Sequence, residues 1–280
     1  MKQLHTYEQY SDKLAAFKQK KGKCSTNKLF TRDELMEKID AGRLYFEEID
    51  NVLWFFVNEG YFYSANFYVP ANLPIRMSKQ DMDVLVELTG NQTRYNEQWE
   101  RELILAGYEK GDMYQEWSSR VDSILDIVNE YNASKRAYFE NRGMFYRKGT
   151  REDSSELQDI WERRLDKSRY TLRPLSEDEW EKIEQHGQCD VICTAGGEIA
   201  ATYLYTMSGK TAYAFHLAAL YKGQGLGSAA LYRLILSAHE NGCTKFTCWI
   251  RSDNLPSIRT HQHVLSPTGK FYIQFVCRAK

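Results

Sequence analysis

The sequence predicts an α/β fold, an α+β arrangement in which helices accompany a mixed sheet. The chain is organised as two similar halves. An expected helix followed by three strand-like runs occurs at residues 31–69 and again at 176–220. In both halves a later strand, a helix and a terminal strand follow. A glycine-rich turn at residues 222–228 joins an apolar run to an amphipathic stretch, and the first half has no counterpart to it.

The first half begins with an amphipathic segment, Tyr7 to Phe17, and a lysine-rich stretch, Lys18 to Lys23, which we interpret as a solvated helix and loop. The next helix is expected over Thr31 to Ala41, because Thr31 and Glu34 have the spacing of a capping box. Strands are then predicted at 43–49, 52–57, 61–69, 83–88 and 108–117, with a helix at 93–106.

Two helical stretches, 119–140 and 152–165, are interpreted as a linker between the halves. The second half opens with a helix at 176–186, in which Ser176 and Glu179 repeat the capping-box spacing. Strands are predicted at 189–194, 198–207, 211–220, 245–250 and 270–277, with helices at 226–239 and 254–263. The predicted domain boundaries are 1–118, 119–168 and 169–280.

Composition narrows the class of protein. A chain of 280 residues with 42% hydrophobic residues can bury a sizeable core. The net charge of −1 argues against a nucleic-acid binder, and the longest apolar run, Val52 to Val57, is too short to span a membrane. None of the six cysteines forms a Cys-x-x-Cys pair, so no metal site is expected. The first ten residues lack the apolar core of a signal peptide, so we expect a cytoplasmic protein. We further expect the protein to be monomeric or homodimeric.

The glycine-rich turn predicts an anion site. Glycine permits backbone angles that other residues avoid and lets a ligand approach the main chain closely. The unpaired N–H groups at the start of the following helix then favour a phosphate. The turn consists of Lys222, Gly223, Gln224, Gly225, Leu226, Gly227 and Ser228.

The order of strand, glycine turn, helix and strand resembles the acyl-coenzyme A core of the GNAT superfamily of N-acetyltransferases. The family turn reads Gln/Arg-x-x-Gly-x-Gly/Ala, and Gly225 and Gly227 occupy the two glycine positions. Lys222 stands at the first position, a departure that keeps the charge. The resemblance covers about residues 169–280 and implies tandem GNAT-like domains, of which the first, 1–118, is degenerate.

Residues after the turn extend the resemblance. Asn254 and Ser257 are similar to the family's Asn-x-x-Ala/Ser, and His261 stands where many members have tyrosine. A second departure is Val264 to Pro267, where members often have Gly-Phe. The resemblance implies that the turn holds the pyrophosphate of coenzyme A and that Asn254 hydrogen-bonds the cofactor; the alternative is that Asn254 caps its own helix. The pantetheine arm would follow the strand backbone at Leu217, Ala218 and Ala219.

The resemblance also implies the chemistry, which is attack of a primary amine on the thioester of acetyl-coenzyme A or another acyl-coenzyme A. Members often place a glutamate base on the strand before the turn, but this strand has no carboxylate. Alternation puts His216 on one face with Ala214 and Ala218, and it is the candidate base; the alternative is a hydrogen-bonded histidine of the core. Glu198 is a second candidate, and His261 or Tyr272 is the candidate acid.

Three functions remain open at this point. The first is an acyl-coenzyme A-dependent N-acetyltransferase acting on a small-molecule or peptide amine. The second is a non-catalytic acyl-coenzyme A sensor or structural module, which the missing carboxylate favours. The third is transfer of amino acids from RNA carriers, against which the near-zero net charge argues.

Overall fold

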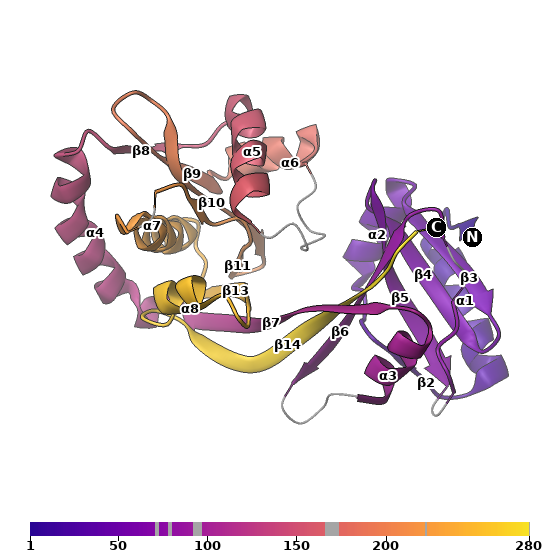
Figure 1. Cartoon of the computed structure of the whole chain (residues 1–280). Helices are drawn as coiled ribbons and strands as arrows, with labels where there is room; N and C mark the ends of the chain where they lie inside the picture. Colours follow the sequence, from indigo (N-terminus) through magenta and orange to yellow (C-terminus); the bar gives the residue numbers. More distant parts are fainter. Residues whose placement is uncertain (71–72, 78–79, 92–96, 166–173, 222, 280) are drawn as a thin grey trace. The chain divides into compact units, whose positions relative to one another are not determined.

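The computed structural model describes residues 1–280 except 71–72, 78–79, 92–96, 166–173, 222 and 280. Helices separate runs of strands along the chain, and the strands pair both parallel and antiparallel, in agreement with the predicted α/β fold with a mixed sheet. The chain divides into two compact units (Figure 1). The first unit is Met1–Met113 with Lys270–Lys280, and the second is Tyr114–Gly269. No helix in the described part of the chain is both long and apolar enough to cross a bilayer.

The first unit contains a mixed sheet with helices on both faces. Its strands are β1 (Lys2–Gln3), β2 (Cys24–Thr26), β3 (Leu44–Ile49), β4 (Val52–Asn58), β5 (Phe62–Pro70), β6 (Asp83–Asn91) and β14 (Ser266–Cys277), the last from Lys270 onward. They follow the order β1-β3-β4-β5-β6-β14, with β2 beside β5. Only β5 and β6 pair in parallel among these described strands.

Strand β4 shows why this unit needs helices on both faces. Leu53, Phe55 and Val57 pack with residues of α1 (Tyr7–Lys21) and α2 (Arg32–Asp40). The alternate residues Trp54 and Phe56 pack in a cluster that includes Leu103 of α3 (Glu97–Leu105). An uninterrupted apolar run is typical of a strand that is buried on both faces. The described residues between β5 and β6 contain no helix, in agreement with the missing glycine turn in the first half.

The second unit has a sheet in the order β7-β13-β11-β10-β9-β8. The strands are β7 (Glu109–Arg120, from Tyr114 onward), β8 (Phe145–Lys148), β9 (Cys189–Cys193), β10 (Ile199–Ser208), β11 (Thr211–Ala214) and β13 (Lys245–Arg251). A two-residue strand, β12 (Ala218–Ala219), also pairs with β10. Strands β11 and β13 run parallel, and the other pairs are antiparallel.

Two helix layers cover this sheet (Figure 1). Helices α4 (Leu125–Glu140) and α7 (Leu226–Glu240) share a core with Tyr203 and Phe246. On the opposite face, α5 (Ser154–Arg164) and α6 (Glu177–Gln185) share a core with Val191 and Leu204. A short helix, α8 (Leu255–His261), follows β13.

The compact units divide the chain differently from the predicted boundaries. The stretch expected to be a helical linker, 119–168, contains β8, which pairs with β9 and so belongs to the sheet of the second unit. Phe139 of α4 and Trp161 of α5 are buried in its two cores. The terminal strand instead pairs with β6 in the first unit, from Lys270 to Cys277. Burial of both linker helices therefore makes them integral parts of the second unit.

Candidate functional site

The predicted strand at 211–220 is interrupted, and this interruption opens the sheet. From Thr211 to Ala214, β11 pairs with β10 on one side and with Lys245–Cys248 of β13 on the other. After a three-residue break the chain resumes pairing as β12, with β10 alone among the described strands. Strand β13 pairs with β7 along its whole length, from Lys245 to Arg251. Beyond Ala214 the two neighbouring strands therefore separate.

Two adjoining cavities, of about 330 and 340 Å³, lie at this opening. Six residues line both of them, namely Arg164, Leu165, Leu217, Asn254, Ser257 and His261. Ala218 and Ala219 line the second cavity only. The structure thus brings together the predicted strand residues, the predicted Asn254 and Ser257, and one predicted catalytic histidine.

Asn254 caps the helix that borders these cavities. Its Oδ1 accepts a hydrogen bond from the Ser257 N–H at 3.2 Å, and Pro256 occupies the first turn of α8. The capping role and a ligand role are compatible, because the Asn254 Nδ2 group donates to no acceptor among the described residues.

The glycine turn leads directly into α7. Gly223 and Gly225 have φ of 76° and 75°, which L side chains rarely adopt, and Gly225 is the N-cap. Gly227 lies within the first turn, where an added Cβ would meet no atom within 4 Å. That turn carries no acidic side chain, so its outward N–H groups present uncompensated positive potential. Lys222, predicted to add a charge here, lies outside the described residues.

Helix α4 contributes a residue that sequence reasoning missed. The Tyr131 ring stacks on Tyr232 of α7, with ring centroids 4.3 Å apart, and its hydroxyl lies 3.5 Å from the Gly225 carbonyl oxygen. A second missed residue is Arg164, whose Nη2 donates to the Leu220 carbonyl oxygen at 2.6 Å. Both belong to helices interpreted as linker, and an amphipathic stripe alone does not reveal such contacts.

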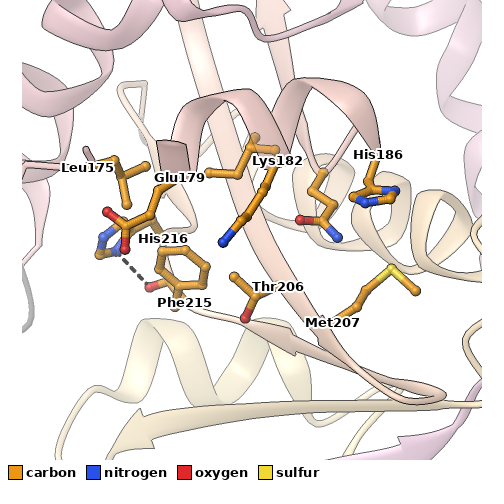
Figure 2. A pocket seen from close by; sticks show the side chains of 10 residues that line it. Leu175, Glu179, Lys182, His186, Thr206, Met207, Phe215 and His216 are labelled. Carbon is orange, nitrogen blue, oxygen red and sulfur yellow. Dashed lines mark hydrogen bonds between the residues drawn. The ribbon is translucent and has the colours of Figure 1, made fainter. Parts of the chain in front are cut away.

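His216 lies away from the two cavities of the sheet opening. Its side chain is 2% exposed, and its ring centroid lies 4.6 Å from that of Trp161 in α5. The Nδ1 atom is 2.9 Å from the Phe215 carbonyl oxygen. Strict alternation does not hold here, because residues 215–217 belong to neither β11 nor β12. His216 instead lines a third cavity of about 540 Å³ with Phe215, Glu179 and Lys182 (Figure 2).

His261 lies on the wall of the sheet opening. Its Nδ1 is 2.7 Å from the Ser257 carbonyl oxygen and 3.3 Å from the Ser257 hydroxyl. A carbonyl oxygen can only accept, so Nδ1 carries the proton and Nε2 holds the lone pair. Burial lowers the pKa of His261, although the bond to the Ser257 backbone opposes this shift. The neutral imidazole is therefore favoured near neutral pH.

The remaining predicted acid is in the other unit. Tyr272 is buried on β14, opposite Thr89 of β6, and both belong to the first unit. The structure therefore does not group Tyr272 with the cavities of the second unit. Glu198, the second candidate base, immediately precedes β10, and its exposed side chain lines none of these three cavities.

Comparison with known proteins identifies the domain that carries the cavities. Residues 154–265 match the model of the acetyltransferase (GNAT) family. Residues 154–265 form a GNAT domain. The match includes α5, the glycine turn and α8, so the domain begins before residue 169, where the sequence resemblance was drawn. No curated protein matches the chain.

Solved structures with the same fold cover most of the chain. A GCN5-related N-acetyltransferase from Sphaerobacter thermophilus aligns with a TM-score of 0.55 at 10% identity, covering 81% of this chain and 76% of that one. A GCN5-related N-acetyltransferase from Kribbella flavida aligns with a TM-score of 0.53 at 13% identity, covering 86% of this chain and 92% of that one. A tandem GNAT protein from the clavulanic acid biosynthesis pathway aligns with a TM-score of 0.52 at 10% identity, covering 82% of this chain and 79% of that one.

These likenesses reach beyond the GNAT domain, and at such identities they establish the fold alone. The likeness to a tandem GNAT protein fits the two-unit arrangement and the repeated order of elements predicted from the sequence. The predicted superfamily and fold class are therefore confirmed.

Proposed function

We propose that the GNAT domain is an acyl-coenzyme A-dependent N-acyltransferase that transfers acetyl from acetyl-coenzyme A to a primary amine by direct attack. The observation that carries this proposal is the opening between β12 and β13, which ends beside the glycine turn of α7. An extended ligand with amides at one end and phosphates at the other suits such a groove. The acceptor is a small-molecule or peptide amine.

The residues present fit coenzyme A. The N–H groups from Gly223 to Ser228 would bind the pyrophosphate, because they stand at the positive end of α7 with no acidic side chain in its first turn. The backbone at Leu217, Ala218 and Ala219 would bind the pantetheine amides along one cavity wall. Asn254 would add a donor through its Nδ2 group. When bound, the cosubstrate supplies the activated acyl group as a thioester.

The two histidines supply proton acceptors on either side of Phe215. An amine that attacks a thioester must lose a proton, and the departing thiolate must gain one. His216 lies at the third cavity, and its Nδ1 contact with the Phe215 carbonyl favours the tautomer with the lone pair on Nε2. We assign it the role of base.

His261 lies on the thioester side of the opening. Its Nε2 holds a lone pair in the neutral form, so it can return a proton to the thiolate only after taking one up. The acid role proposed for His261 therefore depends on prior protonation. A backbone N–H near Leu217 would stabilise the developing oxyanion.

A substitution at Gly227 tests the cofactor assignment without disturbing the fold. A side chain there meets no neighbour within 4 Å, and glutamate in the first helical turn favours α7 through the helix dipole. The same carboxylate would repel a pyrophosphate. We expect Gly227→Glu to melt no lower than the wild type and to lose coenzyme A binding in calorimetry. Gly227→Ala is the matched control, and native affinity in Gly227→Glu would overturn the assignment.

A non-catalytic acyl-coenzyme A module is the second candidate. The observation that favours it is the lining of the two sheet-opening cavities, which includes no aspartate or glutamate among the described residues. Release of free thiol from acetyl-coenzyme A, measured with a panel of primary amines, separates the two functions. Coenzyme A binding without amine-dependent thiol release would favour the module.

A further inference from the structure

The largest of the three cavities, about 540 Å³, lies between α6 and the end of β10 (Figure 2). Three of its lining residues, Glu179, Lys182 and Ile183, come from one face of α6, and a fourth, His186, is the C-cap of that helix. The other lining residues are Leu175, Gln188, Thr206, Met207, Phe215 and His216. Its volume is in the range of small-molecule sites, about 300–1,000 Å³.

One side chain connects this cavity with the sheet opening. Phe215 lines the α6 cavity and also the 330 Å³ cavity that holds Leu217 and His261. No other described residue lines both of these cavities. A molecule in the α6 cavity is thus separated from the thioester side by the segment that interrupts the strand. An amine bound near Phe215 would have the shortest route to a thioester in the opening.

The α6 cavity carries charges of both signs. The Glu179 carboxylate accepts a hydrogen bond from the Ser176 N–H at 2.8 Å and lies with His216 and Phe215 at one end of the view in Figure 2. Lys182 extends over the middle of the cavity in the same view. Its ammonium group forms no ion pair with any acid in the described part of the chain. The cavity therefore offers an anion at the Phe215 end and an unpaired cation beyond it.

From this arrangement we infer that the α6 cavity binds the acceptor as a zwitterion, an α-amino acid with an apolar side chain. Its amino group lies at the Glu179, His216 and Phe215 end, and its carboxylate lies on Lys182. The apolar side chain packs on Leu175, Ile183 and Met207. This inference rests on the proposed N-acyltransferase function and names the class of its substrate.

The two charges of the α6 cavity also favour a free amino acid over other amines. A simple amine leaves Lys182 without a partner, and a peptide N-terminus replaces the carboxylate by a neutral amide. A free amino acid pairs with both charges, and charge-assisted hydrogen bonds are about twice as strong as neutral ones. Transfer then forms an N-acyl amino acid: the ammonium group first gives one proton to His216, the neutral amine nitrogen bonds to the acyl carbon, the carbon–sulfur bond breaks, and the second nitrogen proton ends on the departing thiolate to give the thiol.

Calorimetric titration of the full chain, with and without coenzyme A, tests this inference. The probes are L-phenylalanine, L-phenylalaninamide and phenethylamine, which share the ring and the amine and differ at the carboxylate. We expect L-phenylalanine to bind about tenfold or more tightly than the other two. Equal binding of the three, or tighter binding of the amide, would overturn the zwitterion assignment.

Two substitutions test which side chains bind the charged groups of the amino acid. Lys182→Glu should weaken L-phenylalanine about tenfold or more and leave phenethylamine unchanged or tighter. The exposed Lys210, at the turn between β10 and β11, gives the matched control Lys210→Glu. Glu179→Gln keeps the capping spacing and should weaken all three probes. A Lys182→Glu protein that binds all probes like the wild type would contradict the inference.

The outcomes for the two proposals are distinct. Loss of coenzyme A binding in Gly227→Glu concerns the sheet opening alone. Amino-acid binding is read separately, because titration without coenzyme A reports on the α6 cavity even if the sheet opening binds nothing. Coenzyme A binding with no amino-acid binding in either titration would leave the proposed function standing and refute the acceptor class.

Discussion

Replacing Asp190 by asparagine should stabilise the second unit at neutral pH. Asp190 lies on β9, and its side chain is 3% exposed. Its carboxylate lies 3.2 Å from the Lys148 ammonium and 3.8 Å from Arg233 of α7. Burial raises the pKa of this carboxyl from its ordinary value of 3.8 to about 6, although the two cations act in the opposite direction. Desolvation of the charge therefore outweighs the attraction of its partners.

The size of this stabilisation follows from the linkage between proton binding and folding. A carboxyl with a raised pKa in the folded state binds its proton more tightly there than in the unfolded chain. The contribution of this carboxyl to stability is therefore greatest below pH 4, falls as pH rises from about 4 to about 6, and is constant above that. A difference of about two pKa units corresponds to about 3 kcal/mol at most. The asparagine resembles the protonated acid and avoids this cost, while Lys148 keeps contacts with the Gly187 carbonyl and the Ser237 hydroxyl.

Thermal unfolding between pH 4 and pH 8 measures the effect. At pH 8 the melting temperature of Asp190→Asn should exceed that of the wild type by several degrees, since about 1 kcal/mol shifts it by about 2–4 °C for a domain of this size. The difference should shrink towards pH 4. Asp122→Asn, at an exposed carboxyl, is the control and should change little. A lower melting temperature for Asp190→Asn at pH 8 would refute the reasoning.

Three further predictions concern the site and the domain. His216→Gln should reduce turnover about a hundredfold or more, since general-base catalysis contributes a rate factor of about 10²–10⁴. The affinity for coenzyme A, measured by calorimetry, should be retained. Near-native turnover in a stable variant would end the base assignment. The proposed acid role needs protonated His261, so activity should fall as pH rises above the lowered pKa of this residue, and His261→Phe should lose that limb of the pH–rate profile; an unchanged limb contradicts the role. A fragment of residues 145–280 lacks the buried Val128 and Phe139 of α4, so it should show no cooperative melting by circular dichroism, whereas residues 114–269 should melt cooperatively.

Local chemistry made parts of the fold and site predictable. The capping boxes at Thr31 and Ser176 are present as predicted, because three-residue spacing alone determines them. The positive φ of Gly223 and Gly225 follows from the same kind of local rule. The repeated order of elements was also readable, since each strand and helix has its own hydrophobic period.

The rest depends on tertiary contacts that no short pattern encodes. Alternation placed His216 with Ala214 and Ala218, but the break after Ala214 changes which face each side chain takes. Glu179 was recognised only as a cap, because its second position, on a cavity wall, arises from packing of α6 against the sheet. Strand β8 is four residues long and was hidden between two strong helical patterns.

The interruption between β11 and β12 has a consequence for the order of events in catalysis. Phe215, which lines the cavities on both sides of this break, carries no nucleophilic group that could accept an acyl chain. Under the proposed direct attack of the amine on the thioester, both substrates must be present together, one on each side of the segment, before transfer takes place. Initial rates measured against both substrates should give intersecting double-reciprocal lines, the pattern of a ternary complex, and the free enzyme should never carry a covalent acyl group.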